Sequence, residues 1–133
     1  MDTASIELPG TEIGSISLTD GTLRLHFPKA RIIKTMTGST ERTLWWQAGD
    51  LVIDGAQLPG PLPATPIVCA GGDIDANLYT YRDMIPLPLS TRGRVGCDLK
   101  LSDGSRFQAS GDAIHLEMEG IAKYVEHIRT NAA

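Results

Sequence analysis

Strict alternation of apolar and polar side chains constrains the fold of this chain more than any other feature. Over residues 23–27, 95–101 and 114–118, apolar residues occupy every second position, with polar residues or glycine between them. A period of two gives each strand one buried face and one solvated face. Strands of parallel sheets are apolar on both faces, so the pattern indicates an antiparallel sheet.

Asp-Gly pairs at residues 20–21, 54–55 and 103–104 indicate where these strands turn. Glycine accepts the positive φ that a tight hairpin requires, and residues that oppose one another in a hairpin share a face. Two-residue loops at the first two pairs keep apolar residues together. The expected partners are Leu18 with Leu23, Ile16 with Leu25, Ile53 with Ala56, and Leu51 with Leu58.

The third Asp-Gly pair requires a different loop. A two-residue loop would place Lys100 opposite Phe107, which brings a charge beside an aromatic ring of the core. A three-residue loop over residues 102–104 instead places Leu99 opposite Phe107 and leaves Gly104 at the left-handed third position. The sequence therefore predicts a bulged hairpin here.

The spacing of apolar residues changes toward the end of the chain. Ile121, Tyr124, Val125 and Ile128 follow the i, i+3, i+4, i+7 spacing of an amphipathic helix. A short C-terminal helix is therefore predicted near residues 120–129. Because so short a helix is marginal alone, we expect its apolar face to dock on the sheet.

Two proline-broken segments, residues 59–66 and 84–89, connect or border the strands. Proline lacks the N–H that a sheet ladder uses, so each segment is expected to be a crossing loop or an edge. The pattern as a whole predicts a single all-β domain over residues 1–133. We expect an antiparallel barrel or two-sheet sandwich of about eight to ten strands, with the short C-terminal helix.

Composition excludes several classes of function. The formal net charge is −4 without a basic stripe, so nucleic-acid binding is not expected. No apolar run approaches the roughly 20 residues of a membrane span, and no signal segment is visible. Cys69 and Cys97 are too few for a disulfide framework, and both lie in apolar contexts. We therefore expect a cytoplasmic protein with two buried thiols and no membrane partner.

The pair Trp45-Trp46 is the most informative motif for binding. Adjacent residues on a strand point to opposite faces, so one indole faces inward and the other outward. An indole that faces outward is expected to be shielded from solvent by the C-terminal helix, a partner subunit or a ligand. Alternatively, a bulge in the strand turns both indoles inward. With Met84 and Leu87 of the second proline-broken segment, the tryptophans are the candidates for an interface.

His115, Glu117 and Glu119 lie on one face of a predicted strand. An imidazole and two carboxylates at this spacing can bind a transition metal if another histidine is near, and His26 also faces solvent. Alternating glutamates are ordinary on a sheet surface, so a solvated outer face is the favoured interpretation. No metal or cofactor is therefore predicted.

Two further motifs match only part of a known metal-binding or catalytic pattern. Asp73 and Asp75 have the spacing that opens a calcium loop, but the glycine and the final glutamate of that loop are missing, so a strand is favoured. Cys69 precedes two glycines and would act as a nucleophile only beside a histidine, so a buried structural cysteine is favoured. The residues of an enzyme would be His26, His115 or Cys69 with Asp73 or Asp75.

The absence of a complete catalytic motif favours a small binding or protein-interaction domain, homodimeric and without catalytic activity. Two alternatives stay open. One is a small enzyme with a pocket, and the other is a carrier of a small apolar ligand inside a barrel. The polar residues that remain candidates for such a pocket are His26, Cys69, Asp73, Asp75, His115 and Glu117.

Overall fold

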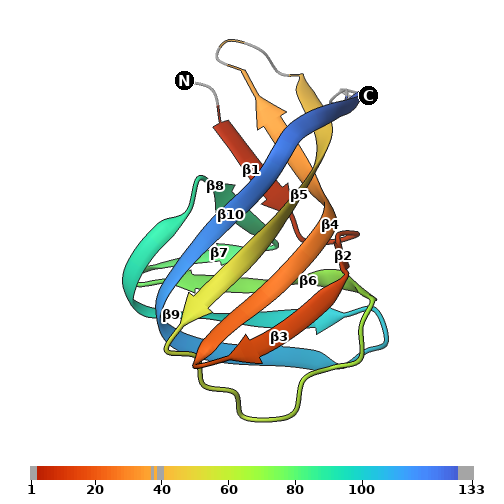
Figure 1. Ribbon diagram of the computed structural model, residues 1–133. Coiled ribbons are helices and arrows are strands. Elements are labelled where there is room, and N and C mark those ends of the chain that lie inside the picture. Colours follow the sequence, from red (N-terminus) through yellow and green to blue (C-terminus); the bar gives the residue numbers. More distant parts are fainter. Residues whose placement is uncertain (1–2, 37, 39–40, 129–133) are drawn as a thin grey trace.

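The computed structural model describes residues 3–36, 38 and 41–128. Within this part of the chain every element is a strand, and the strands form one antiparallel sheet (Figure 1). The strands are β1 (Thr3–Glu7), β2 (Glu12–Ile13), β3 (Ser15–Thr19), β4 (Thr22–Thr35), β5 (Arg42–Asp54), β6 (Ile67–Ala76), β7 (Tyr79–Arg82), β8 (Met84–Leu87), β9 (Ser90–Leu101) and β10 (Arg106–Ile128). The prediction of an all-β antiparallel fold of about eight to ten strands is confirmed.

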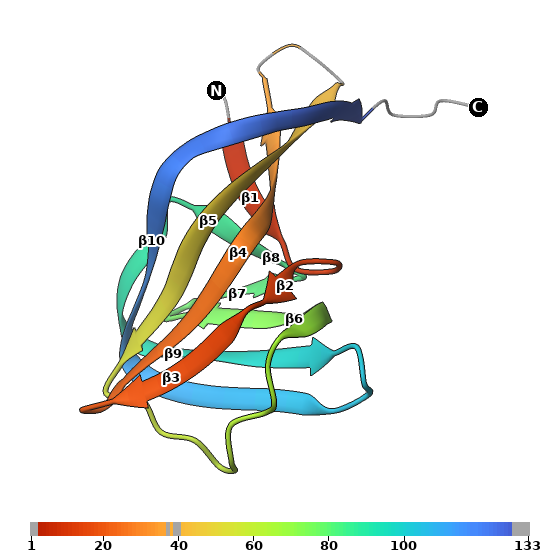
Figure 2. The same ribbon diagram turned by 45° about the vertical axis from the view of Figure 1, so that its right-hand side comes forward.

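The strand order in the sheet is β2-β6-β9-β10-β5-β4-β1-β8, with β3 added to β4 and β7 added to β6. The path ends at β2 and β8, so the fold is one open sheet rather than a closed barrel or two stacked sheets. Figures 1 and 2 show that the sheet curves strongly, because β4, β5 and β10 run steeply while β6 and β9 cross below them. The inner face of this curved sheet encloses the core.

The core consists of the alternating apolar residues that the sequence indicates. Leu23, Leu25 and Phe27 of β4 are fully buried, as are Leu99 of β9 and Ile114 of β10. Burial of a side chain of this size contributes roughly 1.5–3 kcal/mol. The alternation thus reports directly which face of each strand is inside.

Two of the three Asp-Gly hairpins are confirmed. The first pairs Leu18 with Leu23 across a two-residue loop. The third pairs Leu99 with Phe107 across the predicted three-residue loop. In both cases the apolar residues that oppose one another lie on the same face of the sheet, although Leu18 on β3 is 42% exposed. Facing side chains therefore select the loop length.

The hairpin predicted at Asp54-Gly55 is wrong. The strand β5 ends at Asp54, and the chain then leaves the sheet for the connection to β6. The position beside Ile53 is taken by β4 on one side and by β10 on the other, so no edge remains for residues 56–58. The Ala56 N–H instead donates to the Gly21 carbonyl at 2.8 Å.

The predicted C-terminal helix is wrong as well. Residues 120–128 belong to β10 and lie along β5, while Arg129 lies outside the described residues. The helix-like spacing arises from two register shifts, at residues 119–123 and 124–126, which insert extra residues and change the phase of the strand. Isoleucine, tyrosine and valine also favour strands. Among the described residues, no helix is long and apolar enough to cross a membrane.

The proline-broken segment at residues 84–89 borders the sheet, as predicted. The strand β8 ends the path and, within the described part of the chain, pairs with β1 alone. Two apolar residues of this segment, Ile85 and Leu89, are buried in the core. The other segment, residues 59–66, lies in the connection between β5 and β6.

One end of three neighbouring strands forms a feature that we call the arm, and β1 pairs with its β4 part at residues 32–35. It consists of residues 30–35 of β4, 42–47 of β5 and 121–128 of β10, and Figure 2 shows its end projecting from the body of the molecule. The ladders are interrupted at its base, by residues 28–29 in β4 and by residues 120–122 in β10. Such bulges bend strands, so these insertions set the direction of the arm.

Candidate functional site

The arm carries both tryptophans, on opposite faces of the sheet. Trp45 packs against the core, and its Nε1–H donates to the Thr43 hydroxyl at 2.8 Å. The Tyr124 ring meets the indole edge-on at a centroid distance of 5.4 Å, and the Lys34 ammonium lies 4.2 Å from the ring centre. Trp45 is therefore held by contacts within its own chain.

Trp46 lies on the outer face and remains 37% exposed. The Lys29 ammonium lies 4.7 Å from the centre of its ring, where a cation is attracted to the aromatic face. An open groove of about 300 Å³ runs beside the indole, between it and the irregular part of β10. We call it the arm groove, and its lining includes Lys29, Trp46, Gln47, Glu119 and Ile121.

The irregular part of β10 forms the other wall of the arm groove. The Gln47 amide donates to the backbone carbonyls of Glu119 at 3.3 Å and of Gly120 at 3.1 Å, which holds the bulge in place. Gly120 has a φ of +65°, which glycine adopts without the steric cost of a side chain. Ile121 follows it and is 88% exposed. Together with Trp46, it places apolar surface on both walls.

One edge of β10 is unpaired along the arm. The β9–β10 ladder ends at His115, and the last backbone hydrogen bond on that side runs from the Leu116 N–H to the Leu89 carbonyl, at 3.0 Å. In the described parts of the chain no strand pairs with this side of residues 117–128, whereas β5 covers the other side. Alternate N–H and C=O groups there are open to a further strand.

A network of charged side chains covers the outer face at the base of the arm. Arg24 donates to Asp50 at 2.7 Å and to Glu117 at 3.1 Å, and His26 Nδ1 lies 2.6 Å from Asp50 Oδ1. His115 Nε2 lies 2.9 Å from the Glu117 carboxylate. Hydrogen bonds from Arg24 and then His115 hold the pKa of Glu117 below its ordinary value. The Asp50 side chain is only 10% exposed, so its carboxylate depends on these partners.

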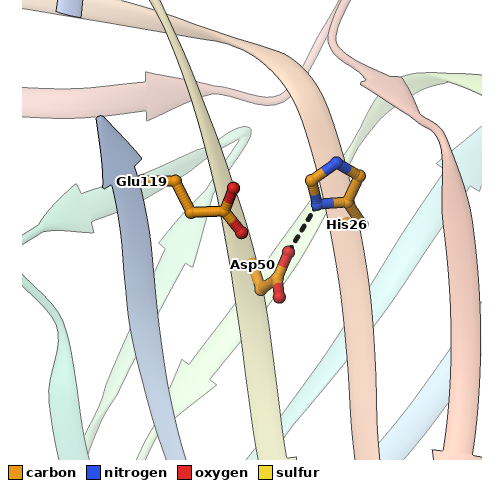
Figure 3. Close-up of side chains that lie close together, drawn as sticks. All are labelled: His26, Asp50 and Glu119. Atoms are coloured by element: carbon orange, nitrogen blue, oxygen red, sulfur yellow. Dashed lines mark hydrogen bonds and ion pairs between the residues drawn. The ribbon is translucent and has the colours of Figure 1, made fainter. Parts of the chain in front are cut away.

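Glu119 completes this group of residues, which we call the outer-face cluster. Figure 3 shows its carboxylate directed toward the hydrogen bond between His26 and Asp50. One potential ligand atom from each of the three residues lies within 4.8 Å of the other two. The ladders explain this proximity, because His26 is opposite Asp50 and Glu119 is opposite Ala48, two residues away on β5.

All four members of the histidine–glutamate set that the sequence indicates lie in the outer-face cluster. Asp50, which joins β4 to β10 there, is the functional residue that sequence reasoning misses. A signal for it exists, since Leu51 faces the core and its neighbour Asp50 must face outward. That His26 lies opposite Asp50 follows from the register of the β4–β5 ladder, which the local sequence pattern does not reveal.

The other polar candidates are not brought together with a histidine. Asp73 pairs with Arg82 at 3.3 Å, and Asp75 accepts a hydrogen bond from Thr80 at 2.8 Å. Both aspartates lie in β6, so the prediction of a strand rather than a calcium loop is confirmed. No hydrogen bond or ion pair among the described residues joins either aspartate to a histidine or to Cys69.

Of the four predicted interface residues, only Trp46 is exposed. Leu87 packs against the core, and Met84 is half-buried on β8 at the far end of the sheet path. Comparison with protein-family models, with curated proteins and with solved structures gives no match. The functional argument therefore depends on the arm and on the outer-face cluster, which meet at Glu119.

The two cysteines are free and buried, as predicted. Cys69 Sγ donates to the Gly71 carbonyl at 3.3 Å, and burial raises the pKa of its thiol. Burial also raises the pKa of Cys97, to about 12. A nucleophilic cysteine requires the thiolate, which both environments disfavour at neutral pH.

We expect neither thiol to be alkylated at an appreciable rate by iodoacetamide in the folded protein at neutral pH. Because the folded pKa values are raised, the thiolate fraction stays small until the pH approaches those values. Mass spectrometry of the protein after timed labelling measures the rate, and labelling in denaturant, where both thiols should react, is the control. Rapid alkylation of Cys69 in the native protein would contradict this expectation.

Proposed function

We propose that the protein is a non-catalytic binding domain that assembles as a homodimer through the unpaired edge of β10. The observation that carries this proposal is the long open edge over residues 117–128, beside the exposed side chain of Ile121. A second copy of the same edge, running antiparallel, supplies the missing hydrogen-bond partners and continues the sheet across the dimer.

A second copy suits this edge because the contact is self-complementary. A two-fold axis near Ile121 brings this residue close to the partner's Ile121, and Lys123 close to the partner's Glu119. Each copy then contributes the same apolar contact and the same pair of opposite charges, as an isologous interface requires. The contact uses the β10 edge of both copies at once, so this interface closes on itself at two subunits.

The two arm grooves would lie on one continuous surface in such a dimer. Each groove keeps Trp46 on one wall, with the Lys29 ammonium over its ring. Aromatic side chains beside lysine are suited to binding a further molecule at the surface. We therefore place the binding surface of the domain on the outer face of the paired arms.

Replacing Ile121 with lysine is the test of this interface. The substitution opposes two positive charges at the two-fold axis and removes the apolar contact, so we expect the dimer dissociation constant to rise about tenfold or more. Native mass spectrometry and light scattering over a range of concentrations measure it. The side chain is 88% exposed, so the fold of a single chain should be unaffected.

Leu78→Lys is the matched control, because Leu78 is 89% exposed but lies in the turn between β6 and β7. The wild-type protein and this control should both be dimeric at micromolar concentration. A wild-type protein that stays monomeric at its highest soluble concentration, or an Ile121→Lys variant that dimerises equally well, would remove the basis of the proposal.

A further inference from the structure

We propose that His26, Asp50 and Glu119 bind one divalent transition-metal ion on the outer face at the base of the arm. The three side chains come from β4, β5 and β10 and converge on one point (Figure 3). An imidazole nitrogen with two carboxylate oxygens is a donor set that Zn²⁺ and related first-row ions accept. This site goes beyond the assembly proposed above and does not depend on it.

The spacing of the donor atoms fits a single ion after small side-chain movements. His26 Nδ1 and Asp50 Oδ1 are 2.6 Å apart, and a Glu119 carboxylate oxygen lies within 4.8 Å of one potential ligand atom of each of these two residues. Donors bound to one Zn²⁺ at 2.0–2.2 Å are separated by roughly 3.3–3.6 Å in a tetrahedral arrangement. Because Glu119 is exposed, its carboxylate can make most of this adjustment.

The β-ladders and one side-chain hydrogen bond hold the three positions. His26 and Asp50 face one another in the β4–β5 ladder, and Asp50 is kept in place by Arg24, which binds its other carboxylate oxygen at 2.7 Å. A ligand that is oriented by a neighbouring hydrogen bond binds a metal more tightly than a free one. Solvent can supply the remaining ligands, since His26 and Glu119 are both accessible.

The charge balance of the outer-face cluster also favours a cation. Arg24 is the one cationic side chain in the cluster as we define it, against the carboxylates of Asp50, Glu117 and Glu119, so two negative charges remain when the histidines are neutral. The Glu119 carboxylate has no hydrogen-bond or ion-pair partner among the described residues. Even in the proposed dimer, with the partner's Lys123 beside Glu119, the cluster keeps a net negative charge.

The test is a calorimetric titration of chelator-treated, tag-free protein with zinc chloride. We expect one ion per chain, and we expect Co²⁺ to produce visible absorption bands as it fills the same site. His26→Gln and Glu119→Gln should each weaken binding by about a hundredfold or more, because loss of a ligand exceeds the roughly 10–100-fold cost of losing a residue that only supports one. Asp50 is left intact because its burial makes its removal a risk to folding.

His115→Gln is the matched control, since His115 lies in the same cluster but binds Glu117 instead. It should retain full affinity, and circular dichroism should show that all variants are folded. Absence of zinc binding to the wild-type protein, or binding that survives both ligand substitutions, overturns the proposal. Loss of binding in His115→Gln overturns the assignment of these three ligands.

The same titration on the Ile121→Lys variant separates the metal site from the dimer. All three proposed ligands belong to one chain, so a monomeric variant should still bind one zinc ion per chain. Loss of binding in this variant alone would show that the site is completed by a second copy and would contradict the site as stated.

Discussion

Replacing Gly72 with alanine is expected to lower the free energy of unfolding by roughly 2–6 kcal/mol, the sum of a backbone and a steric cost. Gly72 has a φ of +140°, where residues with a side chain are strained. A Cβ atom at this position would lie 2.3 Å from the Asp98 carbonyl oxygen and 2.7 Å from the Leu99 Cα. Both atoms are backbone of β9, so neither can move without opening the β6–β9 ladder.

Urea denaturation followed by far-ultraviolet circular dichroism, which reports on the whole sheet, measures this change. Gly60→Ala is the matched control, because an added Cβ there meets no atom within 4 Å and its φ is not in the left-handed region. The control should change the stability by no more than about 0.5 kcal/mol. Equal stabilities of the two variants would show that the β9 backbone shifts at little energetic cost to admit the added Cβ atom, contrary to the central position of β9 beside β10.

Replacing Phe27 with alanine is expected to cost about 3–5 kcal/mol, because it leaves a cavity that the surrounding core fills only in part. Phe27 is fully buried, and it is the last residue of β4 before the interruption that directs this strand into the arm. Loss of the ring removes core packing at that bend. The arm should therefore lose its order before the rest of the sheet unfolds.

Thermal and urea unfolding, recorded separately by far-ultraviolet circular dichroism and by tryptophan fluorescence, test this second expectation. Both tryptophans lie in the arm, so their fluorescence reports on it specifically. Phe27→Leu keeps most of the volume and should cost about 1.5 kcal/mol or less. A loss below about 1 kcal/mol for Phe27→Ala would mean that the core closes over the missing ring.

The parts of the fold that the sequence predicts are those where one strand face is buried and the other is wet. Leu23, Leu25 and Phe27 alternate because β4 faces the core on one side only, and the pattern can be read without knowing any neighbour. The loop lengths at the first and third hairpins follow from the same rule. Local chemistry is sufficient there because the paired residues are close in sequence.

The failures have one physical origin, which is pairing between distant segments. Nothing near Asp54 shows that both sides of β5 are already taken, by a strand before it and by one that begins at Arg106. Nothing near residue 120 shows that a bulged strand, and not a helix, produces the observed spacing. A local pattern indicates which face of its strand a residue lies on, but it does not indicate which residue lies opposite in the neighbouring strand.

The candidate site divides in the same way. His26, His115, Glu117 and Glu119 can be recognised as outward-facing ligand types from alternation alone. Asp50 enters the cluster through the register of two ladders, which places it opposite His26 and two residues from the partner of Glu119. The sequence therefore shows which residues could be ligands, whereas their coming together at one site depends on how the strands pair in the folded sheet.

The position of β10 between β5 and β9 has a consequence for how the chain reaches its native state. The strands β4 and β5 are near in sequence and can associate early, but β5 acquires its second neighbour only when the segment from Arg106 onward returns to it. Closing the long loop between β5 and β10 is slow, because the chain loses conformational entropy before the stabilising contacts between these strands form. Until then one edge of β5, a largely apolar strand, is unpaired. During this interval the partly folded sheet is most prone to aggregate with other chains.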